Sequence, residues 1–188
     1  MFNTGKSTTA SRKLHSIHVL QDDKNFSGKI ETGRIGYKFT FSPSSAAIDD
    51  GKLVLTGVVT VKAPAGASRK VENVRATCMA SQGNIQNAPA KPASIGASLK
   101  HPLPAQQADK PLTDATDNLS SAGVIYFKLS KLDGRALGVA LDMSSVQLNA
   151  RLNPKSETER DLQWLYSAIT AADNPKPYLD GLSLMLGK

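Results

Sequence analysis

Residues 52–62, KLVLTGVVTVK, decide the fold of this chain. Apolar residues recur at every second position, which is the period of a β-strand, and the positions between them include two further valines. A strand that is apolar on both faces is typical of the centre of a sheet that is covered on both sides. The sequences on either side of it are turn formers: Asp49-Asp50-Gly51 before it and Pro64-Ala65-Gly66 after it.

The same alternation predicts further strands outward from this one. Tyr37, Phe39 and Phe41 alternate with polar residues, so we expect a strand that begins near Gly36. We expect it to end at Pro43, because proline cannot donate a hydrogen bond to a neighbouring strand. Alternation also predicts strands over residues 71–79, 123–129 and 146–152.

The C-terminal part changes to a helical period. Ser156 and Glu159 have the spacing of a capping box, and Leu162, Leu165 and Ile169 recur at helical spacing. The sequence therefore predicts a helix over residues 156–172. The last apolar segment, 178–186, fits either a short helix or a closing strand.

These elements indicate a mainly β (α+β) fold, an antiparallel β-sandwich or a partly open barrel with one C-terminal amphipathic helix. Residues 1–33 show no sustained period, so we expect a flexible basic arm that contributes at most one strand, near 16–20. Residues 34–188 are expected to form a single β-rich domain. Within it, residues 86–120 are rich in proline, alanine and glutamine and predict a long excursion from the domain.

Composition excludes several classes of protein. The single cysteine, Cys78, excludes a disulfide framework and multi-cysteine metal sites. No histidine spacing suggests a metal site, and no sequence feature calls for a cofactor. The chain has neither a transmembrane run nor the apolar core of a secretory signal, so we expect a cytoplasmic protein.

Positive charge gathers in the first half of the sequence. The net charge is +7, and residues 1–100 carry 14 basic and 6 acidic side chains. An uneven positive balance favours polyanionic partners. The candidate binding residues are the basic ones beside the predicted strands: Arg34, Lys38, Arg69, Lys70 and Arg75.

The aromatic strand offers a more specific possibility. Tyr37, Phe39 and Phe41, with Arg34 and Lys38 beside them, could form a platform on which single-stranded nucleic acid stacks. The alternative is that these rings belong to the core.

No catalytic constellation is found in the sequence. Cys78 falls on the inward side of its predicted strand, and Gly5-Lys6-Ser7 lacks the earlier glycine and strand of a phosphate-binding loop. Asp49, Asp50 and Asp142 are explained by turns and strand ends. We therefore predict that the protein is not an enzyme.

The leading functional hypothesis is a non-enzymatic binding or assembly module that engages another protein, or a second copy of itself, through the arm and the long excursion. One alternative is nucleic-acid or polyanion binding through the basic N-terminal half. The other is a carrier of an apolar ligand within the β framework, suggested by the small inward residues Gly57, Ala76 and Ala150.

Overall fold

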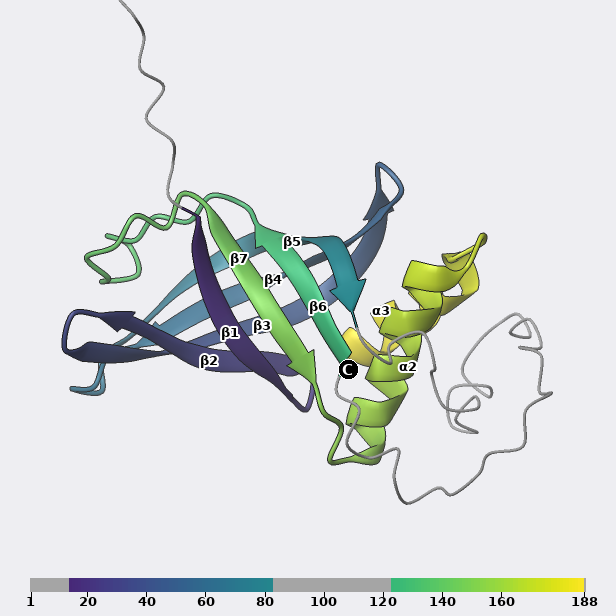
Figure 1. Cartoon of the computed structure of the whole chain (residues 1–188), viewed down its shortest axis with the longest axis horizontal. Helices are drawn as coiled ribbons and strands as arrows, with labels where there is room; N and C mark the ends of the chain where they lie inside the picture. The colour runs from purple at the N-terminus through teal and green to yellow at the C-terminus, as the bar shows by residue number, and fades with distance from the viewer. Residues whose placement is uncertain (1–13, 83–122, 188) are drawn as a thin grey trace, which may run out of the picture.

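A computed structural model describes residues 14–82 and 123–187 of the chain. In this part, seven strands form a closed barrel with two helices at one end of it (Figure 1). The strands are β1 (His15–Asp22), β2 (Asn25–Thr32), β3 (Ile35–Asp49), β4 (Lys52–Lys62), β5 (Ser68–Gln82), β6 (Gly123–Leu129) and β7 (Val146–Leu152). The helices are α2 (Glu157–Ala171) and α3 (Lys176–Leu186).

Consecutive strands pair antiparallel, and the barrel closes by a parallel pairing of β1 with β7. Because the number of strands is odd and each strand reverses direction, the first and the last must run the same way. The expected β class is thus confirmed, but the sheet is a closed barrel and neither a sandwich nor a partly open one. Closure gives every strand two neighbours, although β1 and β2 pair with each other only over residues 19–22 and 25–28.

The strands predicted over 52–62, 123–129 and 146–152 are β4, β6 and β7, with the predicted bounds, and the one over 71–79 lies within β5. β4 pairs with β3 and β5, but every strand of a closed barrel has two neighbours, so no strand is central in the predicted sense. The outer face of β4 is partly covered: Val54 is buried and Val58 is half-buried.

Aromatic rings fill the barrel interior. The ring of Phe26 lies 6.5 Å from that of Phe41, 5.8 Å from that of Phe127 and 6.1 Å from that of Tyr166, measured between centroids. All four side chains are fully buried. Offset and tilted arrangements at such distances are favourable for aromatic pairs.

The strand expected near 16–20 is present as β1, but the rest of the predicted N-terminal arm is wrong for residues 25–32, which form β2. Each of these strands sends two large apolar side chains inward, Ile17 and Val19 from β1 and Phe26 and Ile30 from β2, too few for a sustained period. Residues 1–13 lie outside the described part, as do the predicted excursion at 86–120 and its surroundings.

The predicted end of a strand at Pro43 is also wrong, because β3 continues to Asp49. Pro43 pairs with Gly57 and Ser45 pairs with Thr56, so Ser44 is an extra residue in a β-bulge. A bulge tolerates proline because the ladder is interrupted there. Opposite it, a Cβ on Gly57 would lie 2.2 Å from the carbonyl oxygen of Ser42, so the bulge needs glycine at this position.

The C-terminal region contains two helices where one was predicted, because 176–186 is helical and not a closing strand. The predicted capping box at the start of α2 is confirmed: the Ser156 side chain accepts from the Glu159 amide, and Glu159 accepts from the Ser156 amide. The rings of Trp164 and Tyr178 join the two helices edge to face at 5.6 Å. Ser183 Oγ of α3 donates to the carbonyl of Ala46 in β3 at 3.3 Å.

Glu159 also ties α2 to the barrel. Its Oε1 accepts from the amide of Asp23, in the turn between β1 and β2, at 2.9 Å, and its Oε2 accepts from the amides of Lys155 and Ser156. Burial acts to raise the pKa of Glu159, but these three amides stabilise the carboxylate more strongly and lower the pKa below its ordinary value.

Replacing Glu159 with Gln should lower the free energy of unfolding at pH 7 by about 1 kcal/mol, the difference between charged and neutral hydrogen bonds. A carboxylate whose pKa is lowered by folding stabilises the protein above its unfolded pKa of about 4.3, and this contribution is lost as the pH falls through the folded pKa. Urea denaturation of the unmodified protein and of Glu159→Gln at pH 7 and at pH 3 measures the effect. A difference in unfolding free energy between the two proteins that is equally large at both pH values would contradict the prediction.

Replacing Gly57 with Ala should destabilise the barrel by about 1–3 kcal/mol, because the new methyl group overlaps the β3 backbone. Gly36→Ala is the matched control, since a Cβ there meets no atom within 4 Å. Thermal denaturation of the two variants compares them, and equal midpoints would refute the steric role of Gly57.

Candidate functional site

A groove of about 1500 Å³ lies on the outside of the barrel, where β1 and β2 separate. β1 pairs with β7 over residues 15–20, but its pairing with β2 spans only residues 19–22. The rest of β2 pairs with β3 alone among the described strands. The outer faces of β6, β7 and β1 therefore form one wall of the groove, and those of β2, β3 and β4 form the other.

Gly28 lies at the line where the two walls meet. A Cβ at this position would lie 2.2 Å from the carbonyl oxygen of His18 and 2.9 Å from Cγ1 of Val19. No side chain fits into this space, so glycine is what allows β2 to approach β1 before the two strands separate.

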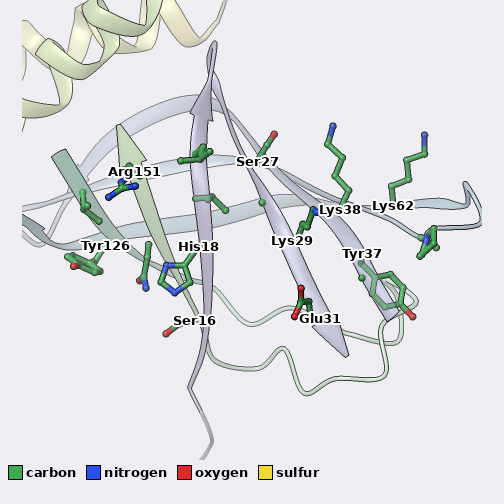
Figure 2. A pocket seen from close by; sticks show the side chains of 18 residues that line it. Ser16, His18, Ser27, Lys29, Glu31, Tyr37, Lys38, Lys62, Tyr126 and Arg151 are labelled. Carbon is green, nitrogen blue, oxygen red and sulfur yellow. The ribbon is translucent and has the colours of Figure 1, made fainter. Parts of the chain in front are cut away.

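The wall formed by β2, β3 and β4, which we call the lysine wall, carries a row of three lysines. Lys29 in β2 pairs in register with Lys38 in β3, and Lys38 pairs with Lys62 in β4. All three are exposed on the outer face, and Figure 2 shows Lys38 and Lys62 extending side by side. None of them makes an ion pair within the described part of the chain. Like charges on directly opposed strand positions repel each other.

The wall formed by β6, β7 and β1 is polar and aromatic. His18 in β1 and Tyr126 in β6 both pair in register with Asn149 in β7. Two of these side chains are held in place by hydrogen bonds: Tyr126 Oη donates to Gln82 Oε1 at 3.0 Å, and Asn149 Oδ1 accepts from Gln147 Nε2 at 2.8 Å. Figure 2 shows His18, Tyr126 and Arg151 on the side of the groove away from the lysines.

The groove is strongly electropositive. Its lining includes four cationic side chains, Lys29, Lys38, Lys62 and Arg151, and a single carboxylate, Glu31. A concave surface lined by one sign of charge concentrates ions of the opposite sign. The groove is thus a candidate site for an anion.

The structure does not bring the five basic residues predicted from the sequence together. Lys38 lines the groove. Arg34 is exposed in the turn between β2 and β3, and the Arg69 side chain lies against Gly138, in the loop before β7. Lys70 forms an ion pair with Glu72 at 2.7 Å, and Arg75 forms one with Asp49.

The predicted aromatic platform is wrong. Phe39 and Phe41 are fully buried inside the barrel, and Tyr37 is half-buried. Their alternation reflects the inward face of β3, which is the core interpretation that the sequence also allowed. The rings that line the groove are those of Tyr37 and Tyr126, and both are half-buried.

The sequence could have indicated part of the groove. Ser27, Lys29 and Glu31 alternate with Phe26, Gly28 and Ile30, which is the period of a strand with its polar face outward. His18, Tyr126 and Arg151 carry no local signal, because their neighbours come from strands far apart in the sequence.

The described residues show neither a metal cluster nor a reactive thiol. No group of three or more His, Cys, Asp or Glu side chains among them could hold a metal ion. Cys78 is buried, and burial raises the pKa of its thiol. No helix within the described ranges has the length and apolar character needed to cross a membrane.

The lysine row should cost stability when no anion is bound. Replacing the central Lys38 with Glu converts two repulsive pairs into attractive ones and should raise the melting temperature by about 1–4 °C at low salt. Salt should weaken this gain by screening. Lys131→Glu, on an exposed loop, is the control with the same change in net charge. Equal melting temperatures for the two variants would show that Lys38 is not under repulsion.

The chain was also compared with known proteins. No protein family, curated protein or solved structure matches it. A function for this barrel must therefore be argued from the groove itself.

Proposed function

We propose that this protein is a non-enzymatic binding module whose groove takes an anionic ligand that carries phosphate groups. The observation that supports the proposal is the row Lys29–Lys38–Lys62, in which each cation faces another across the sheet without a carboxylate partner in the described part. An anion placed over this row would relieve the repulsion and gain several charge-assisted contacts.

The groove favours binding over catalysis. Its ionisable groups other than cations are the imidazole of His18, the carboxylate of Glu31 and the phenols of Tyr37 and Tyr126. Acid–base and nucleophilic catalysis need groups within hydrogen-bond reach of each other, and among the described residues no hydrogen bond joins any two of these four.

The other functional hypotheses stand differently. Binding of a protein partner through residues 1–33 and 86–120 stays a prediction, because residues 1–13 and 83–122 lie outside the described part and 15–32 belong to the barrel. A carrier of an apolar ligand is less favoured, because the rings of Phe26, Phe41, Phe127 and Tyr166 occupy the interior.

The direct test is retention on a heparin column and titration with inorganic polyphosphate. The variant with Lys29, Lys38 and Lys62 all replaced by Gln should bind polyphosphate at least about tenfold more weakly at 0.1 M salt, because it makes three fewer contacts that release counterions.

The matched control replaces Lys52, Lys131 and Arg160 with Gln. These residues are exposed, lie outside the groove and give the same net charge. Equal weakening in both triple variants would mean that net charge, and not the groove, attracts the anion. Absence of any polyphosphate or heparin binding by the unmodified protein would refute the proposed function.

A further inference from the structure

We infer that the ligand of the groove is a single-stranded nucleic acid, with its phosphates on the lysine row and its bases against Tyr126 and His18. This inference rests on the proposed function and names its ligand class. It differs from the aromatic platform considered in the sequence, because the rings assigned to the bases come from β1 and β6, although Tyr37 of β3 also lines the groove.

The two walls of the groove differ in chemistry. The wall from β2, β3 and β4 carries the three lysines, with Glu31 and Tyr37 beside them, and lysines contact phosphate oxygens regardless of sequence. The opposite wall presents a phenol ring, an imidazole and an amide, the groups on which bases stack and with which they form hydrogen bonds. A strand of nucleic acid has the matching asymmetry, with a charged backbone on one edge and unpaired bases on the other.

On the wall formed by β6, β7 and β1, hydrogen bonds hold two side chains in place without a ligand. The Tyr126 hydroxyl is anchored by its hydrogen bond to Gln82, and Asn149 accepts from Gln147 through its Oδ1. Side chains that are already ordered lose less entropy on binding.

The other polyanions use the groove less fully. An acidic peptide or polyphosphate contacts the lysine row but offers no ring to stack on Tyr126 or His18. A duplex keeps its bases stacked on one another, so it presents phosphates and base edges but no base face that could stack on Tyr126 or His18. A vesicle surface is broad and cannot enter a groove between two walls.

The test uses fluorescence anisotropy with a labelled oligothymidylate of 20 nucleotides and the full chain. Tyr126→Ala and His18→Ala should each weaken binding of this oligonucleotide by about 5- to 150-fold, the effect of losing one stacked base. Neither substitution should alter binding of polyphosphate or the salt dependence. Tyr126→Phe keeps the ring and should bind within about twofold of the unmodified protein.

The variant with Lys29, Lys38 and Lys62 replaced by Gln tests the lysine wall separately. It should weaken binding of both polyphosphate and oligonucleotide and reduce the slope of log affinity against log salt by about 2, since each single-strand phosphate contact contributes about 0.7. His18 is exposed, so its variant is expected to fold even where Tyr126→Ala does not, and circular dichroism checks both.

Three outcomes would overturn the inference while leaving anion binding intact. They are equal affinity for oligothymidylate and polyphosphate with no effect of either wall substitution, tighter binding of a 20-base-pair duplex than of the single strand, and tighter binding of polyglutamate or of phosphatidylserine vesicles. Failure to bind any of these polyanions would refute the proposed function as well.

Discussion

The parallel pairing of β1 with β7 is the constraint on which the rest of the structure depends. Seven alternating strands leave the first and the last pointing in the same direction, so the sheet can close in this way alone. β1 pairs with β7 along residues 15–20, whereas β2 stays paired with β1 up to Gly28 and separates from it beyond that residue. One strand thus completes the barrel and also borders the groove, so the fold and the candidate site have the same origin.

The helices cover one end of the barrel. For the most buried of their rings, the favourable and unfavourable contributions to the folding free energy partly cancel. Full burial of the Tyr166 ring against Phe26 contributes about 1.5–3 kcal/mol, but its hydroxyl lacks a hydrogen-bond partner in the described part, which costs about 1–3 kcal/mol. The attachment of α2 therefore depends on its other contacts. These are the apolar side chains of Leu162 and Leu165 and the link from Glu159 to the turn at Asp23.

The local spacing of apolar residues predicted much of the fold but few of the residues that line the groove. Strands 52–62, 123–129 and 146–152 and the capped helix follow from the periodicity of their large apolar residues, although β4 also buries Val54 on its outer face and α2 buries every side chain from Asp161 to Ile169. The lysine row depends on register. Counting back from the Asp49–Lys52 pair would place Lys38 opposite residue 63, and the extra residue Ser44 shifts its partner to Lys62 on the same face. The alternation of apolar residues does not predict a bulge at a proline. The sequence alone therefore predicts that the strand ends at Pro43.

The shared direction of β1 and β7 has a mechanical consequence. The chain enters β1 at His15 and leaves β7 at Leu152, and in a parallel pair these two points lie at opposite ends of the barrel. A force applied along the chain at these points slides the strands past each other and loads all their hydrogen bonds together, instead of opening them one after another. The seam that closes this barrel is thus arranged to resist stretching, and joining its two ends would require a linker as long as the barrel.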